Sequence, residues 1–331
     1  MNKINLGIIG LGNQGKIHLR NCMHLENVIV KGVADISKKN LDFAMKLGIK
    51  NAYTNYEDIL KDEQINAVII SLPNFLHLEA SLKAAEAGKH VFIEKPMGRN
   101  VEECREILSA FQKNNLKLMV GYGLRFHPVV KRIREKIMDG FFGEVQIVES
   151  TYVSSGPFSP KSNRVGPVPV PSWWFDKKLA GGGSFLDLGS HMIDLLLWFF
   201  GEVKDVESYI YYTFNLEIED VATCVLKFKK GPLAIVNTGW FSKDFTRSIQ
   251  ICGTAKNLWF NLSRSNVVKE ILKHVKKKIG WYSSDPYYLE LAHFMNCLQK
   301  DEEPNPSGED GLRCHEVISW AYRKAFEKIK N

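Results

Sequence analysis

The chain opens with an apolar run that leads into three closely spaced glycines: Ile4-Asn5-Leu6-Gly7-Ile8-Ile9-Gly10-Leu11-Gly12-Asn13-Gln14-Gly15. The run has the length of a buried strand, and a helical pattern follows it as far as Leu25. A G-x-G-x-x-G spacing between a strand and a helix is the context of a dinucleotide-binding turn. Gly10 permits the tight turn, Gly12 lets the backbone approach a pyrophosphate, and Gly15 lets the helix pack on the strand. The N–H groups that begin the helix would then face the phosphates.

A carboxylate ends the next expected strand. Asp35 follows Val28–Ala34 and lies 20 residues after Gly15. Such a carboxylate accepts hydrogen bonds from ribose hydroxyls and repels a 2′-phosphate, which favours NAD over NADP. Lys38 and Lys39 leave NADP open, since a nearby cation would hold the extra phosphate. The alternative is a glycine turn without a ligand, and three agreeing features disfavour it.

Strand-length and helix-length patterns alternate over residues 1–121. The expected strands are Ile4–Ile9, Val28–Ala34, Ala67–Leu72, His90–Ile93 and Lys117–Val120. The expected helices are Gln14–Leu25, Lys38–Leu47, Tyr56–Lys61, Leu76–Ala87 and Val101–Asn114. Strands that are apolar on both faces and are each followed by a helix predict an α/β domain with a covered parallel sheet.

The pattern changes after Tyr122, and we expect residues 122–331 to form a second α/β domain. Its expected strands are Glu144–Val153, Val206–Tyr212, Asp220–Phe228, Leu233–Trp240, Ser248–Cys252 and Asn257–Phe260. Its expected helices are Pro128–Met138, a long helix after Gly181-Gly182-Gly183, Tyr287–Gln299 and Glu309–Ile329. Alternating polar and apolar residues predict an open, mostly antiparallel sheet with one solvated face. Residues 157–171 hold five of the twelve prolines and predict an extended loop. We expect the last helix to pack back on the first domain.

Composition excludes several classes of protein. The chain has 331 residues, of which 24% are charged and 45% hydrophobic, which is typical of a globular protein with two domains. No apolar run approaches the ~18 residues of a membrane span. The first residues do not have the pattern of a signal peptide. The six cysteines form no C-x-x-C pair, and this scattered distribution favours a reducing cytoplasm.

The net charge of +7 is a mild excess that identifies no partner. Lys269–Lys278 holds five lysines, and a phosphate-binding patch is one interpretation. A solvated helix face is favoured, because no aromatic residues interleave with the lysines. We therefore expect neither a nucleic-acid nor a membrane partner.

Glu94-Lys95-Pro96 follows the expected strand His90–Ile93. The carboxyl ends of parallel strands are where ligands bind in open α/β sheets. A lysine there would hold a substrate oxygen and stabilise developing alkoxide charge. The alternative is a solvated surface lysine, and only its position favours a functional role.

The long helix after the three glycines carries a polar stripe. Asp187, His191 and Asp194 fall at i, i+4 and i+7, and Leu195–Phe200 beyond them is strongly apolar. Histidine exchanges a proton near neutral pH. Gly189 costs about 1 kcal/mol inside a helix, and close approach to a flat ligand would explain it. A core histidine bonded to the backbone is the alternative. A metal is not expected, because a third ligand is missing.

These motifs together resemble the glucose-fructose oxidoreductase / inositol dehydrogenase / rhizopine catabolism (Gfo/Idh/MocA) family. The resemblance covers nearly the whole chain and implies an N-terminal Rossmann domain. It implies Lys95, Asp187 and His191 as the catalytic trio. The cofactor-binding residues that it and the motifs imply are Gly10, Gly12, Asn13, Gln14, Gly15, Asp35, Ser71, Pro73, Asn74, His77, Glu94 and Lys95. The expected substrate-binding residues are Lys95, Arg125, Trp173, Trp174, Asp187 and His191.

Two departures from the family lie near the expected substrate pocket. Trp173-Trp174-Phe175-Asp176 stands where many members have Trp-Arg before the glycine run, and His127 stands where Asp or Asn is common. Trp173 and Trp174 would stack on a pyranose or pack in the core, and the sequence does not choose between these.

We therefore expect an oxidoreductase that uses NAD, or NADP, on a secondary hydroxyl of a sugar, a sugar derivative or a cyclitol. His191 would abstract the hydroxyl proton, Lys95 would polarise the oxygen and Asp187 would orient the pair. The alternatives are a redox-neutral, NAD-assisted glycosidase and a cofactor-binding sensor without catalysis. We also expect a homodimer or homotetramer through the sheet face of residues 203–260. The large apolar side chains that we expect on that face are Tyr209, Tyr211, Phe228, Trp240 and Trp259.

Overall fold

The computed structural model describes residues 3–158, 170–262 and 285–329. Packing divides the chain into two compact units. The first unit is residues 1–126 with 282–312, and the second is residues 127–281 with 313–331. Residues 285–312, which we expected in the second domain, pack in the first unit. Lys269–Lys278 and most of the expected loop 157–171 lie outside the described residues.

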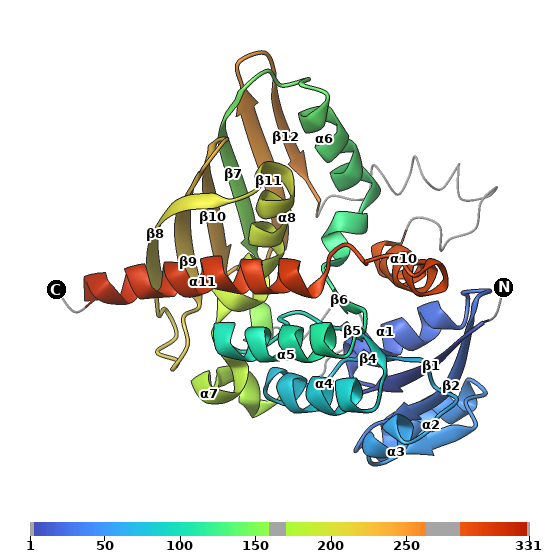
Figure 1. Cartoon of the computed structure of the whole chain (residues 1–331). Helices are drawn as coiled ribbons and strands as arrows, with labels where there is room; N and C mark the ends of the chain where they lie inside the picture. Colours follow the sequence, from blue (N-terminus) through green and yellow to red (C-terminus); the bar gives the residue numbers. More distant parts are fainter. Residues whose placement is uncertain (1–2, 159–169, 263–284, 330–331) are drawn as a thin grey trace. The chain divides into compact units, whose positions relative to one another are not determined.

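The first unit is built on a parallel sheet of six strands in the order β3-β2-β1-β4-β5-β6 (Figure 1). The strands are β1 Ile4–Ile9, β2 Val28–Ala34, β3 Asn51–Tyr53, β4 Ala67–Ile70, β5 His90–Ile93 and β6 Leu118–Val120. The parallel sheet is the predicted one. The short strand β3 was not predicted, because three partly exposed residues carry too little pattern.

Helices connect these strands, as the apolar patterning predicted. They are α1 Asn13–Cys22, α2 Lys38–Lys46, α3 Glu57–Leu60, η1 Asn74–Leu76, α4 His77–Glu86, α5 Val101–Lys113 and η2 Gly123–Phe126. Asn100 caps α5, because its side chain accepts the N–H of Glu103.

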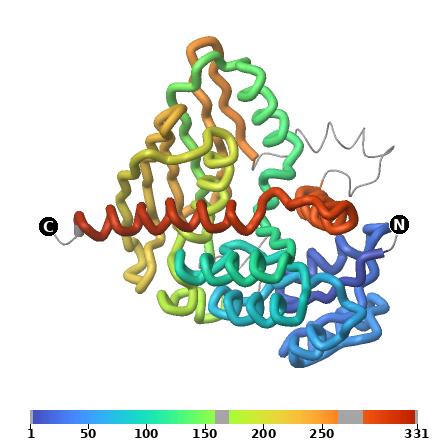
Figure 2. Tube along the Cα trace, in the orientation of Figure 1, coloured from blue at the N-terminus to red at the C-terminus, as the bar shows by residue number. Residues whose placement is uncertain are grey.

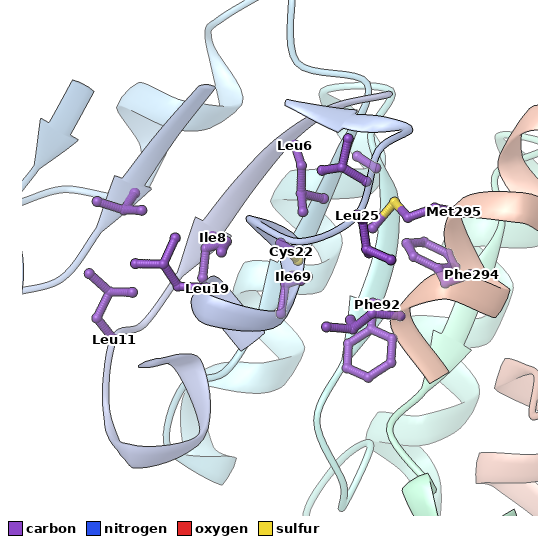
Figure 3. Close-up of a cluster of buried hydrophobic side chains, with 14 of the residues drawn as sticks. Leu6, Ile8, Leu11, Leu19, Cys22, Leu25, Ile69, Phe92, Phe294 and Met295 are labelled. Atoms are coloured by element: carbon purple, nitrogen blue, oxygen red, sulfur yellow. The ribbon is translucent and has the colours of Figure 1, made fainter. Parts of the chain in front are cut away.

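The core of the first unit includes a helix from far along the chain. Leu6, Ile8 and Leu19 are fully buried and belong to one hydrophobic cluster with Phe294 and Met295 of α10, Pro286–Lys300 (Figure 3). Burying large apolar side chains stabilises the fold by ~1.5–3 kcal/mol each. This packing explains why α10 belongs to the first unit although the preceding β-rich segment does not.

The second unit contains a mixed sheet in the order β12-β11-β7-β10-β9-β8, which Figure 2 shows as a Cα trace. The strands are β7 Val145–Val153, β8 Val203–Tyr211, β9 Val221–Phe228, β10 Leu233–Gly239, β11 Thr246–Gly253 and β12 Asn257–Asn261. Only the β10–β7 pair is parallel among the described pairs, so the prediction of a mostly antiparallel sheet is confirmed.

The helical segments of this unit are α6 Pro128–Met138, η3 Gly156–Phe158, η4 Ser172–Phe175, α7 Lys177–Ala180, the π-helical turn η5 Phe185–Gly189 and α8 Ser190–Phe200. The helix α8 packs on β7 and β10. The last helix, α11 Gly308–Ile329, begins in the first unit and continues in the second. Within the second unit it reaches β8, where the Ser208 hydroxyl donates to the carbonyl of Ala321.

The two faces of the mixed sheet differ in exposure. Tyr209, Tyr211 and Trp259 are exposed on one face by 66%, 66% and 57%. Phe228 and Trp240 are buried, so the prediction that they belong to the exposed face is wrong. Phe228 lies on the inward side of the period-2 pattern of β9, and Trp240 follows the end of β10 and turns inward.

Among the described helices, none has the length and apolarity needed to cross a membrane. The six cysteines all lie in the described residues, and none of them forms a disulfide there.

Candidate active site

The glycine turn after β1 is shaped by close contacts. Gly10 has φ +89°, and a Cβ there would lie 2.3 Å from the carbonyl oxygen of Ser71. A Cβ at Gly15 would lie 1.9 Å from the carbonyl oxygen of Gly10. At Gly12 a Cβ would meet nothing within 4 Å. Two glycines therefore serve the tight turn, and the third leaves open space in front of the backbone.

The start of α1 carries polar groups suited to an anion. Gly12 is the N-cap residue and makes no side-chain cap hydrogen bond, so the first N–H groups of α1 lack a side-chain acceptor. Gly12 and Asn13 are exposed, and Gln14 is partly exposed. The helix dipole adds partial positive charge at this end. These residues fit the pyrophosphate of a dinucleotide.

Asp35 holds the same turn from the neighbouring strand. Its carboxylate accepts the N–H of Leu11 at 2.6 Å and the N–H of Ser37 at 2.7 Å. Asn40 also donates to Asp35, and the Lys16 ammonium donates to Asn40 at 2.6 Å. The cation linked to Asp35 through these contacts is therefore Lys16, which the sequence analysis did not name.

His77 connects the loops that follow β4 and β5. Its ring is buried, with Nδ1 2.8 Å from the carbonyl oxygen of Pro96 and Nε2 2.9 Å from that of Leu72. Burial lowers the pKa of His77, which favours a neutral ring that donates to one of these carbonyls. The Lys95–Pro96 peptide is cis. His77 thus holds the backbone beside Lys95.

The other predicted residues of these loops are placed by the backbone. The N–H of Ser71 donates to the carbonyl of Ile9, which ties the loop after β4 to β1. Pro73 is the N-cap of η1, and Asn74 is its first residue. The structure thus places Ser71, Pro73 and Asn74 after β4 and Lys95 after β5, at carboxyl ends of neighbouring parallel strands.

Glu94 belongs to a buried cluster that the sequence analysis missed. Its Oε1 lies 2.5 Å from Nε2 of His18, and its Oε2 accepts the N–H of Lys95. Glu290 on α10 is 1% exposed, and neither of its carboxylate oxygens has a partner in the described structure. One ligand atom from each of the three residues lies within 4.8 Å of the other two. Burial, followed by the charges of Glu94 and Asp285, raises the pKa of Glu290 well above its usual range, so its neutral form is favoured.

Arg125 is buried rather than open to a substrate. Its guanidinium pairs with the carboxylate of Asp310 at 3.2 Å and donates to the side chain of Asn305 at 2.9 Å. These contacts join η2 to the start of α11 within the first unit. We assign Arg125 this structural role and leave it out of the proposed substrate site.

His127, the departure from the family pattern, is the N-cap of α6. Its Nδ1 accepts the N–H of Val129 at 3.2 Å. Burial, followed by the charge of Arg247, lowers the pKa of His127 to about 4. A neutral His127 therefore caps a helix, as Asp or Asn does at such a position.

Asp187 lies in the π-helical turn η5 and His191 in the first turn of α8. The Trp240 indole N–H donates to Oδ2 of Asp187 at 3.3 Å. The ring of His191 is partly exposed, and its centroid is 5.9 Å from that of Tyr152. Asp194 is 1% exposed, so it does not continue the accessible stripe. π-helical turns are often found at functional sites.

The flat group close to Gly189 belongs to the protein itself. A Cβ at Gly189 would lie 2.8 Å from Cδ2 of Phe185, four residues earlier. The expectation that Gly189 makes room for a flat ligand is therefore wrong, because the Phe185 ring occupies that side. The wide π turn places this ring against the helix backbone.

Trp173 and Trp174 lie in η4 and are both partly exposed. Their rings stack on each other with centroids 5.2 Å apart. Trp174 also meets Trp240 edge-on at 6.3 Å, and Trp240 bonds Asp187. Trp174 is thus linked to the Asp187 carboxylate through Trp240. Trp173 and Trp174 pack on each other and remain partly exposed to solvent.

Residues 4–122 match the model of an oxidoreductase family with an NAD-binding Rossmann fold. Residues 130–258 match the C-terminal domain of the same Gfo/Idh/MocA family. The chain belongs to this family. Its N-terminal domain is therefore an NAD-binding Rossmann domain, as the sequence predicted.

Several relatives cover most of the chain. An oxidoreductase named P35 from Formosa agariphila is 32% identical over 69% of this chain and 70% of its own. A myo-inositol 2-dehydrogenase from Thermotoga maritima is 26% identical over 99% and 98%. A levoglucosan dehydrogenase, solved with NADH and L-sorbose, aligns with TM-score 0.86 at 23% identity over 99% and 98% of the two chains.

Sequence reasoning missed the residues that support the site from a distance. His18 pairs with Glu94, Trp240 donates to Asp187, Glu290 lies near Glu94, and Glu219 accepts backbone N–H groups of the segment before Asp187. His18 gave a weak signal, as a polar residue among apolar ones on an amphipathic helix. Glu290, Glu219 and Trp240 gave none, because their partners are far away in the sequence.

Proposed function

We propose that this protein is an NAD-dependent dehydrogenase or reductase that acts on a secondary hydroxyl of a sugar, a sugar derivative or a cyclitol. The observation that carries the proposal is the start of α1, where Gly12 has open space and no side-chain cap. The substrate class is supported by the dehydrogenases of inositol and levoglucosan among the relatives.

NAD, when bound, accepts or returns the hydride. In the proposal His191 takes the proton of the substrate hydroxyl, because its partly exposed imidazole is suited to general base catalysis. Lys95 holds the reacting oxygen and stabilises its developing negative charge. Asp187, itself held by Trp240, orients the proton acceptor. Gly12 and the start of α1 hold the pyrophosphate.

NAD is the proposed physiological cofactor, with NADP bound more weakly. The carboxylate of Asp35 braces the glycine turn and would repel a 2′-phosphate. Lys16, held by Asn40, is the cation that would compete with this repulsion. Titration of both cofactors by fluorescence quenching tests the preference. We expect at least several-fold tighter binding of NAD; equal affinity or a preference for NADP would contradict it.

The proposal is tested with NAD and a panel of sugars, sugar acids and cyclitols, followed by the absorbance of NADH. The matched control is His191→Ala, which should bind NAD normally and form little NADH. Stoichiometric NADH formation supports the dehydrogenase. Glycoside cleavage without net NADH would instead support the NAD-assisted glycosidase, and cofactor binding without turnover would support the sensor.

We also propose a homodimer or homotetramer that covers the exposed sheet face. Tyr209, Tyr211 and Trp259 are the large exposed aromatic residues on its strands. Apolar groups of this size on one face favour association. Light scattering at micromolar concentration tests this proposal, and a monomer would contradict it. The cytoplasm remains the proposed location, because the described structure contains no disulfide.

A further inference from the structure

Glu219 lies two residues before β9 and is 3% exposed, and its carboxylate accepts several hydrogen bonds. Its carboxylate accepts the N–H of Gly183 at 3.0 Å and the N–H of Phe185 at 2.9 Å. The Tyr322 hydroxyl on α11 donates to the same Oε1 at 2.8 Å. A buried carboxylate with three donors is a fixed anchor for the groups that donate to it.

The anchored segment is the one that carries Asp187. Gly183 and Phe185 lie four and two residues before Asp187, and the backbone N–H of Asp187 donates to the carbonyl of Gly183. The Ser184 N–H donates to the backbone carbonyl of Glu219 at 2.9 Å. A Cβ at Gly183 would lie 1.8 Å from that carbonyl oxygen, so only glycine permits this approach.

Asp220, the residue after Glu219, is linked to Asp187 through Trp240. The backbone carbonyl of Asp220 accepts the N–H of Trp240 at 2.9 Å, and the Trp240 indole donates to the Asp187 carboxylate. The carboxylate of Asp220 is engaged elsewhere, by the N–H groups of Thr213 and Phe214. Glu219 and Asp220 therefore hold Asp187 from its backbone and from its side chain.

We infer that Glu219 is a positioning residue for the reaction proposed above: its charged carboxylate fixes the start of the Asp187 segment, and gain of a proton releases it. This inference rests on the proposed function for its catalytic consequence. Glu219 touches neither Asp187 nor His191 through its side chain in the described contacts. It acts through the backbone of Gly183 and Phe185.

The charge state of Glu219 is finely balanced. Burial raises its pKa to about 7, against the lowering effect of the Phe185, Tyr322 and Gly183 donors. The titratable groups that face it in the described structure are Tyr322 on α11 and Tyr212 after β8, and burial raises the pKa of both. Both tyrosines are therefore neutral near pH 7, so among these three groups Glu219 is the one that changes charge there.

The test follows the Trp240 indole N–H by nuclear magnetic resonance as pH is varied, with Trp240→Phe to assign the signal. In the wild type we expect the signal to move with a midpoint near 7. In Glu219→Gln this movement should vanish. In Tyr322→Phe the midpoint should rise, because a donor that lowers the pKa of Glu219 is lost. Glu217→Gln, the same change at an exposed position two residues earlier, should behave as the wild type.

An unchanged midpoint in both Glu219→Gln and Tyr322→Phe would overturn the inference. Where Glu219→Gln does not fold, Tyr322→Phe decides alone, by whether its midpoint rises. With a substrate found by the panel, Glu219→Gln should lower kcat by about 10-fold to 10²-fold and change KM little. A pH-dependent Trp240 signal without any hydride transfer would refute the proposed function and leave the anchoring role standing.

Discussion

The glycine turn of the first unit and the Asp187 segment of the second are held in different ways. In the glycine turn, a Cβ at Gly15 would meet the carbonyl oxygen of Gly10, a Cβ at Gly10 would meet that of Ser71 after the neighbouring strand β4, and Gly12 faces open space. The Asp187 segment is held by Glu219 and Trp240, which lie 36 and 53 residues from their partners Gly183 and Asp187. The glycine turn is marked by a motif that is visible in the sequence, whereas Asp187 is held by polar contacts with residues far along the chain.

The largest effect is expected from the reacting groups. His191→Ala should lower kcat by roughly 10²-fold to 10⁴-fold, the range for a lost general base, and leave NAD affinity nearly unchanged. Lys95→Ala should lower kcat and also raise KM, because it removes a charge that contacts the ground state. Steady-state kinetics measures both. Near-normal turnover of His191→Ala would make Lys95 the leading candidate for the base.

Two substitutions in the glycine turn should have different effects, one on the stability of the fold and the other on cofactor binding. Gly15→Ala places a Cβ 1.9 Å from a backbone oxygen, so we expect a loss of about 1–3 kcal/mol or more in unfolding free energy. Gly12→Ala meets no protein atom within 4 Å, so stability should be unchanged and NAD affinity should fall by about 10-fold or more. Denaturant unfolding and NAD titration measure the two quantities. Equal behaviour of the two variants would contradict the proposed division of roles.

Much of the first unit follows from sequence alone. The strands β1, β2 and β5 have the expected bounds, because each is an apolar run that ends at a polar or glycine residue. In the second unit α6 is also reproduced, since Pro128 starts it and an apolar stripe defines it. The inclusion of residues 282–312 in the first unit was not predictable, because the burial of Phe294 and Met295 depends on tertiary packing.

The candidate site also combines features that the sequence predicts with features that it does not. The glycine turn was predictable from the spacing of Gly10, Gly12 and Gly15 between a strand and a helix, whereas the close approach of Gly10 to Ser71 was not. The π turn at Asp187, the structural pairing of Arg125 with Asp310, and the cluster of His18, Glu94 and Glu290 were not. These features depend on contacts between residues without a shared sequence pattern.

A substitution at Glu290 tests whether this buried carboxyl group of the first unit is protonated in the folded protein. Its pKa is raised in the folded state, so its contribution to stability is full at low pH and is lost as pH rises from the unfolded pKa, about 4.3, toward the folded value. The Glu290→Gln variant has no carboxyl group to ionise at this position, so it does not lose stability in this way as pH rises. Its unfolding free energy relative to the wild type should therefore increase as pH rises from 5 to 8, as urea denaturation would measure. A relative stability independent of pH would contradict the assignment.

The smallest effect is expected at Trp240. Trp240→Phe keeps most of the aromatic packing and removes one N–H donor from Asp187. A hydrogen bond of this kind contributes ~1 kcal/mol, so kcat should fall by about 5-fold. Trp174→Phe is the control that changes the neighbouring ring and leaves the Asp187 hydrogen bond intact. An equal loss of kcat in both variants would assign the effect to packing.

The most direct test of hydride transfer uses a panel substrate that carries deuterium at the carbon of the reacting hydroxyl. The wild-type protein is incubated with this substrate and NAD, and the cofactor is then analysed by mass spectrometry. The account predicts NADH that carries the label in amounts equal to the oxidised substrate, and its loss in His191→Ala. Unlabelled cofactor in the presence of substrate turnover would contradict it.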